Sequence, residues 1–133
     1  MRLNPDCVRA ILLAVEEATD VETGLYYTAG PDEDDENAPT VLAGYTDNEI
    51  RYHINQCDLA GFFTDCNQYV NGNCLIMDLS PIGHEFLANI REESNWEKVK
   101  NISTKAGSKS LKAMSQIATA VIEGLIKSQL GLP

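Results

Sequence analysis

The chain has 133 residues, of which 44% are hydrophobic, enough for one globular domain with a sizeable core. It contains no run of about 18 apolar residues and begins without the apolar stretch of a secretory signal, so we expect neither a membrane span nor export. A cytoplasmic location with four reduced cysteines is therefore expected. Residues 1–94 hold 18 acidic and 4 basic side chains, whereas residues 95–133 hold 2 and 6, which gives the net charge of −10. An acidic body with a basic tail segment is a poor match for a polyanion, except through that tail.

The first 45 residues predict one helix and a long acidic loop. Asn4 as N-cap and Pro5 in the first turn begin a helix over residues 4–18. Residues 19–45 form the acidic loop, in which residues 25–28 are a possible short strand. The run Asp32–Glu36 consists of five consecutive acidic residues and is typical of a solvated loop. Residues 40–42 fit either a second strand or a helix remnant.

The stretch from 46 to 93 has the order helix, hairpin, helix. Thr46 and Glu49 form a capping box for a helix over residues 46–60, which Gly61 ends. Asn71-Gly72 predicts a two-residue turn between strands 64–70 and 73–79. In that register the core side of the hairpin carries Cys66, Val70, Leu75, Met77 and Leu79. Ser80-Pro81 then begins a helix over residues 81–93, with inward positions Ile82, Phe86, Leu87 and Ile90, and with Gly83 allowing close approach of another backbone.

Two further helices follow. Ser94 or Asn95 caps the first, which carries Trp96, Val99, Ile102 and Ala106 on one side and stops at Gly107. The last helix, from about 109 to 129, has a coiled-coil-like seam of Leu111, Met114, Ala118, Val121 and Leu125. This seam fits intrachain packing and a homodimer interface equally well.

The element order predicts an α+β fold, a winged helix with two additional C-terminal helices. Residues 1–94 form the winged-helix domain and residues 95–133 the helical extension, which packs on the domain or on a second copy.

Three segments resemble the YjcQ-type family of uncharacterised winged-helix proteins from bacterial genomes, prophages and phages. They are Leu3–Arg9 with Ile11-Leu12, then Glu49–Ile54 with Ala60-Gly61-Phe62, and finally Leu79–Leu87 with Asn89-Ile90-Arg91 and Trp96. The most specific piece is Leu-Ser-x-x-Gly-His-x-Phe-Leu. The resemblance implies a winged-helix fold and a phage or mobile-element context, and it implies no activity. The acidic loop and the acidic start of the 46–60 helix depart from the family pattern.

A winged helix presents its recognition helix to the major groove of DNA. The outward candidates on residues 46–60 are Asp47, Asn48, Arg51, Tyr52, Asn55 and Gln56. Of these, Arg51, Tyr52, Asn55 and Gln56, together with Lys98 and Lys100 of the basic segment, form the nucleic-acid-binding set. Asp47, Glu49 and Asp58 repel phosphate, and the hairpin tip has no Arg or Lys.

Signatures of metal binding and catalysis are weak. His53, Cys57, Cys66 and Cys74 are a conceivable zinc set, but no Cys-x-x-Cys exists and the expected register puts Cys66 and Cys74 on opposite faces. No phosphate loop, nucleophile elbow or His-Glu-x-x-His occurs. We therefore expect no metal, no cofactor and no enzyme.

Two functions fit these patterns. The first is a non-enzymatic phage- or prophage-type accessory protein, a DNA-associated transcriptional regulator that acts as a homodimer. The second is an acidic module that binds a host or phage protein and not DNA.

Overall fold

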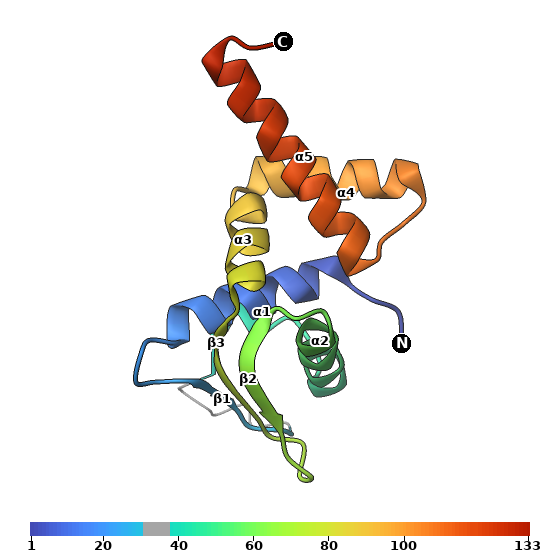
Figure 1. The fold of residues 1–133 in the computed structure, drawn as a ribbon. Helices are drawn as coiled ribbons and strands as arrows, with labels where there is room; N and C mark the ends of the chain where they lie inside the picture. The colour runs from blue at the N-terminus through green and yellow to red at the C-terminus, as the bar shows by residue number, and fades with distance from the viewer. Residues whose placement is uncertain (31–37) are drawn as a thin grey trace. The chain divides into compact units, whose positions relative to one another are not determined.

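The computed structural model describes residues 1–30 and 38–133. Within them the chain forms five α-helices, one short 3-10 helix and a three-stranded antiparallel sheet, an α+β fold (Figure 1). The elements are α1 Pro5–Ala18, β1 Leu25–Tyr27, η1 Thr40–Leu42, α2 Asp47–Leu59, β2 Phe63–Gln68, β3 Cys74–Leu79, α3 Pro81–Ile90, α4 Glu93–Ala106 and α5 Leu111–Leu130. The acidic run Asp32–Glu36 lies outside the described residues, so its expected conformation is left as a prediction.

Contacts between the described residues divide the chain into two compact units, Met1–His84 and Glu85–Pro133. The first unit carries 15 acidic and 3 basic side chains, and the second carries 5 and 7. None of the helices in the described ranges has the length and apolar character needed to cross a membrane.

In the first unit α1 packs against α2, η1 and the sheet (Figure 1). Its inward face includes Cys7, Val8, Ile11 and Leu12, each at most 1% exposed. Burying each of the three larger side chains, Val8, Ile11 and Leu12, contributes roughly 1.5–3 kcal/mol to the stability of the fold. Asn4 caps α1 by accepting a hydrogen bond from the backbone of Asp6, so the predicted start of this helix is confirmed.

The sheet has the order β1-β3-β2, so β3 lies in the middle. The short strand at 25–28 is confirmed as β1, and residues 40–42 form a 3-10 helix.

The hairpin register differs from the predicted one by one residue. Cys66 pairs with Ile76, and Gln68 pairs with Cys74. The Tyr69 N–H donates to the Asn73 carbonyl, and the Gly72 N–H donates to the Tyr69 carbonyl, so the loop has three residues instead of two. Gly72 has φ +91°, as the last residue of such a loop requires.

This slip changes which residues of β3 share the face of Cys66, so that Cys74 and Ile76, and not Leu75 and Met77, lie on the buried side. The predicted inward placement of Val70, Leu75 and Met77 is wrong. Val70 is fully exposed, and Leu75 and Met77 are half-buried. The buried residues of β3 are Cys74, Ile76 and Leu79, of which only Leu79 was expected inside.

The helix ends follow the predicted signals at α2. Thr46 and Glu49 form the expected capping box, and Gly61 follows the helix with φ +80°. The Phe62 N–H then donates to the Cys57 carbonyl across this stop, closing the last turn.

In the second unit α4 packs against α5. Trp96, Val99 and Ser103 of α4 are buried, as are Leu111, Met114 and Ala118 of α5. Ile102 is 43% exposed and Ala106 is exposed, so these two residues do not continue the buried side of α4 that Trp96 and Val99 begin. Ser103 is buried there instead, and its hydroxyl donates to the Ser108 carbonyl. The N-cap of α4 is Glu92 and not Ser94 or Asn95. Gly107 ends α4 as predicted.

The start of α3 is fixed within the first unit. Ser80 donates its hydroxyl hydrogen to the Gly61 carbonyl (2.5 Å) and accepts from the Gly83 N–H (3.1 Å). A Cβ on Gly83 would lie 2.2 Å from the carbonyl oxygen of Phe62, which confirms the close backbone approach. On this helix Phe86, Leu87 and Ile90 are buried as expected, but Ile82 is 57% exposed, so its predicted inward position is wrong.

Candidate recognition groove

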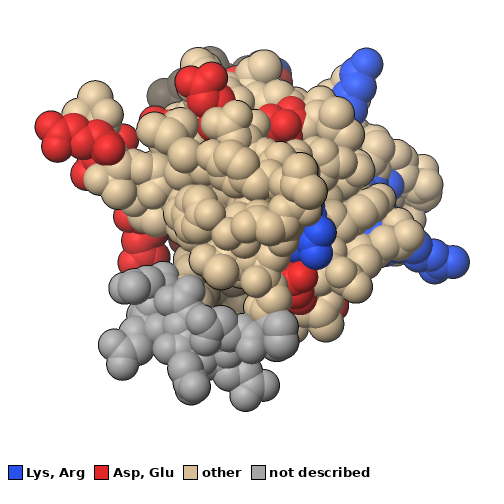
Figure 2. All heavy atoms as spheres, turned by 90° about the horizontal axis from the view of Figure 1, so that it is seen from below, with Lys and Arg blue, Asp and Glu red and all other residues tan. Residues whose placement is uncertain are grey.

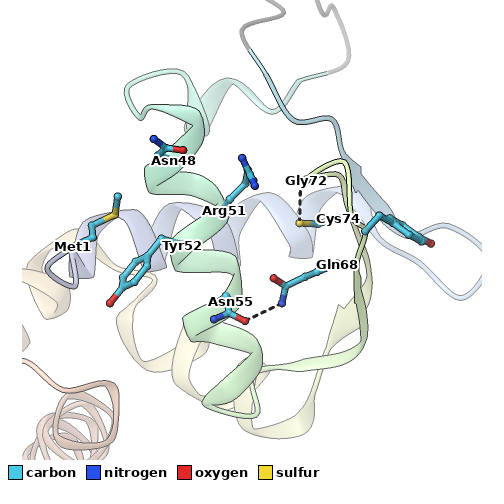
Figure 3. A pocket seen from close by; sticks show the side chains of 9 residues that line it. Met1, Asn48, Arg51, Tyr52, Asn55, Gln68, Gly72 and Cys74 are labelled. Carbon is cyan, nitrogen blue, oxygen red and sulfur yellow. Dashed lines mark hydrogen bonds between the residues drawn. The ribbon is translucent and has the colours of Figure 1, made fainter.

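A groove of about 480 Å³ lies between α2 and the β2–β3 hairpin of the first unit (Figure 3). From α2 come four side chains, and from the hairpin come four residues; Met1 completes the lining. The full set is Met1, Asn48, Arg51, Tyr52, Asn55, Gln68, Tyr69, Gly72 and Cys74. Arg51 is the only charged side chain among these nine residues of the described part of the chain.

Asp47 fixes the position of Arg51 from outside the groove. Its Oδ2 lies 3.2 Å from Nη1 of Arg51, one helical turn further along α2. Its Oδ1 accepts hydrogen bonds from the Tyr27 hydroxyl (2.5 Å) and from the Gly30 N–H (3.1 Å). Asp47 therefore joins the end of β1 to the start of α2 and holds the guanidinium at the same time.

These contacts shift the pKa values of Asp47 and Tyr27 in opposite directions. Burial by itself favours a higher pKa for Asp47, but hydrogen bonds from Tyr27, Gly30 and Arg51 outweigh it and lower the pKa below its ordinary value. Burial, followed by the hydrogen bond to Asp47, raises the pKa of Tyr27. Asp47 is therefore ionised and Tyr27 protonated at neutral pH.

The hairpin loop supports the other side of Arg51. A Cβ on Gly72 would lie 2.9 Å from Cζ of Arg51, so the guanidinium rests directly on this glycine. Further along the groove, Nε2 of Gln68 donates to Oδ1 of Asn55 (3.0 Å), which bridges β2 and α2 (Figure 3).

His53 lies on the opposite, buried side of α2 and is 1% exposed. Its Nδ1 lies 2.7 Å from the Glu49 carbonyl, and its Nε2 accepts the Asn4 N–H at 2.7 Å. Because Nε2 acts as an acceptor, the imidazole is neutral with its proton on Nδ1. His53 therefore joins α2 to the N-terminus of α1 as a structural residue.

Beside Tyr69 of the groove lie further exposed side chains of β1 and of the hairpin loop. The rings of Tyr26 and Tyr69 lie 6.5 Å apart, and the Tyr26 hydroxyl accepts a hydrogen bond from Asn73. Tyr26, Tyr69 and Val70 are 52%, 46% and fully exposed, respectively. Figure 2 looks at the molecule from the hairpin end, and the described residues at the centre of this view are mostly uncharged, with acidic side chains toward one side.

The thiols are protected from ionisation. Burial raises the pKa of Cys7 and of Cys66 to about 12 and raises that of Cys57 and Cys74 as well. Within residues 1–30 and 38–133, no three His, Cys, Asp or Glu side chains come together in a way that would hold a metal ion.

The predicted nucleic-acid-binding residues are only partly brought together. Arg51, Tyr52 and Asn55 line the groove, whereas Gln56 is half-buried on α2 outside its lining. Lys98 and Lys100 belong to α4 in the second unit. Lys98 is exposed, and Nζ of Lys100 lies 3.1 Å from Glu97 and 5.5 Å from the centre of the Trp96 ring.

The predicted dimer residues fall into two groups. Leu111, Met114 and Ala118 are buried within the single chain, at 9%, 0% and 0% exposure. Val121 and Leu125 are half-buried, and beyond them Ile126 and Leu130 are 52% and 67% exposed. The accessible apolar surface of α5 is thus displaced toward its C-terminal half.

Sequence reasoning missed the hairpin side of the groove, that is Gln68, Tyr69, Gly72 and Cys74. No motif marks them, because their position depends on the three-residue loop that sets the register. The Tyr69-Val70-Asn71-Gly72 segment carried the one available signal, since a glycine after Asn also suits a three-residue loop.

The hypothetical-protein family DUF2513 matches residues 2–109, and the chain belongs to this family. No curated protein and no solved structure gives a match.

Proposed function

We propose that this member of the DUF2513 family is a non-enzymatic recognition module that binds a protein partner through the groove between α2 and the hairpin. The composition of the groove carries the proposal: Arg51, Tyr52 and Tyr69 lie there with three amide side chains, and none of the lining residues that the structure describes is Lys, Asp or Glu. Arg and Tyr are enriched, and Lys, Asp and Glu depleted, at the centres of protein–protein interfaces.

The fold supports a winged-helix reading of the first unit. Its order α1, β1, η1, α2, β2, β3 and its strand order β1-β3-β2 suit a winged helix in which η1 takes the place of the second helix. In this reading α2 is the recognition helix and the β2–β3 loop is the wing. The resemblance to YjcQ-type proteins adds a phage or prophage setting and a cytoplasmic location to the proposal.

Charge favours a protein partner over duplex DNA. Residues 1–84 have a net charge of −12, and their basic residues are Arg2, Arg9 and Arg51. Arg51 is already paired with Asp47, so a single guanidinium on this helix would have to take the place of the several phosphate contacts that duplex DNA needs. Since duplex DNA is bound largely through contacts to phosphate, this surface lacks the main source of affinity.

A DNA-associated regulator is the second candidate. It is favoured by the outward amide and guanidinium groups of Arg51 and Asn55 on α2, and by the six lysines between residues 98 and 127. In this function a homodimer through the C-terminal helix would present two recognition helices to a palindromic site.

A salt series separates the two candidates. We expect no shift in the fluorescence anisotropy of a labelled random 30-base-pair duplex at 50 mM salt and 10 µM protein. Binding that weakens steeply between 50 and 200 mM salt would favour the regulator instead.

The groove itself is tested by partner capture with matched variants. Proteins cross-linked to the wild-type chain in lysate of the source cell should be lost with Tyr52→Ala and retained with Gln116→Ala on α5. Equal capture by the two variants would contradict a role for the groove.

A further inference from the structure

We infer that the groove binds an extended acidic segment of the partner, with a Glu or Asp side chain paired to Arg51. This inference rests on the proposed function, because it takes the partner to be a protein, and it adds the chemistry of the segment that is bound.

The first step is that Arg51 is positioned before any ligand arrives. Asp47 binds Nη1, and Gly72 supports Cζ, so the side chain is fixed at two points. Asp47 is in turn fixed by two hydrogen bonds to residues 27 and 30. Nevertheless 43% of the Arg51 side chain stays exposed. A guanidinium that is held in place and still accessible binds a carboxylate at lower entropic cost than a mobile one.

The second step concerns the amide pair beside Arg51. Asn55 uses its Oδ1, and Gln68 uses its Nε2, in the hydrogen bond that links them. The remaining Nδ2 of Asn55 is a donor and the remaining Oε1 of Gln68 is an acceptor. One donor and one acceptor side by side match the C=O and N–H of an extended main chain, which explains why we infer a peptide and not an isolated anion.

The third step distinguishes a carboxylate from a phosphate. Arg51 provides one full positive charge, and the carboxylate of Asp47 lies 3.2 Å from it. A singly charged carboxylate meets less repulsion from Asp47 and from the acidic unit than a phosphate with nearly two charges does. Among the described residues, the lining contains no acidic side chain.

The test is a ¹⁵N-HSQC titration of the full chain with two capped peptides, Ac-Ala-Ala-Glu-Ala-Ala-NH₂ and its Gln counterpart. We expect the Glu peptide to shift the side-chain signals of Arg51, Asn55 and Gln68 in a saturable way, with an affinity about tenfold higher than that of the Gln peptide. Inorganic phosphate serves as a third probe and should leave the amide signals of Asn55 and Gln68 unshifted.

Variants assign the effect to Arg51. Arg51→Gln should remove the preference for Glu over Gln, whereas Lys98→Gln, the same charge change in the second unit, should retain it. If Arg51→Gln loses its spectral dispersion, Arg51→Lys keeps the charge, and its preference should fall several-fold because the planar fork is lost.

Two results would overturn the inference: equal affinities for the two peptides, or phosphate shifting the same amide signals. Either result leaves the proposed function standing as long as Tyr52→Ala still abolishes capture of a protein partner.

Discussion

Gly83 lies in the first turn of α3 against the main chain of Phe62, and this contact leaves no space for a side chain. We expect Gly83→Ala to lower the free energy of unfolding by about 3 kcal/mol, because a Cβ would lie 2.2 Å from a backbone oxygen that cannot move aside easily. Urea denaturation followed by circular dichroism measures the change.

Gly124→Ala is the matched control for this substitution. Gly124 lies within α5, and a Cβ at this position would have no other atom within 4 Å. Because alanine is a better helix former than glycine, Gly124→Ala should stabilise the protein by roughly 0.5–1 kcal/mol. Similar effects of the two substitutions would show that the contact with Phe62 does not constrain the fold.

The four cysteines give the protein a defined response to alkali. Because burial raises the pKa of each thiol above that in the unfolded chain, which is near 9, the folded state keeps its protons where the unfolded state loses them. The contribution of the thiols to the free energy of unfolding is absent below pH 9, and it favours unfolding increasingly as the pH rises from 9 toward 12. We therefore expect the melting temperature to fall across this range.

The measurement is thermal melting at several pH values, and Cys66→Ser is the variant that reports on it. Cys66 is only half-buried, so its replacement should preserve the fold and make the alkaline fall shallower. Native protein should also react slowly with a thiol reagent at pH 8 and rapidly in denaturant. Rapid reaction of all four thiols in the native state would contradict the conclusion that burial raises their pKa values.

The ends of α1 and α2 were predictable from the sequence, whereas the register of the hairpin was not. Asn4, Thr46 and Gly61 determine the ends of α1 and α2 through bonds within a few residues. The hairpin loop has no such local determinant, because Asn71-Gly72 suits a loop of either two or three residues. The choice depends on which face of β3 meets α1, and that is a property of the packed unit.

The same distinction applies to the candidate site. Arg51, Tyr52 and Asn55 were identified because helical periodicity places them outward on α2. The residues of the hairpin that face them depend on the strand register, so sequence periodicity alone misassigns them.

His53 links two helices, and its replacement tests how strongly that link holds them. We expect His53→Phe to lower the free energy of unfolding by about 1–3 kcal/mol, because the partly buried Asn4 N–H loses its acceptor at 2.7 Å. The same substitution at His84, whose side chain is 50% exposed, should change it by less than about 0.5 kcal/mol. Chemical denaturation compares the two, and an equal loss would mean that the bond to Asn4 contributes nothing specific.

For the whole molecule, we predict that the C-terminal half of α5 packs against a second copy of the chain. The seam of this helix is buried within the chain up to Ala118, and it continues through Val121 and Leu125 to the exposed Ile126 and Leu130. Both charged residues beyond 112 in this helix, Glu123 and Lys127, fall outside the seam. A second copy that offers the same uncharged stripe would extend the packing that α4 provides to the first half.

We therefore expect a dimer in size-exclusion chromatography with light scattering at 100 µM, and a monomer for the double variant Leu125→Asp with Ile126→Asp. Gln116→Asp, which adds a charge to an exposed site on the same helix, should leave the dimer intact. The circular dichroism of the double variant should still report folded helices, since neither residue belongs to the buried part of the seam. A wild-type chain that stays monomeric at 100 µM would contradict the prediction that this apolar stripe of α5 is a dimer interface.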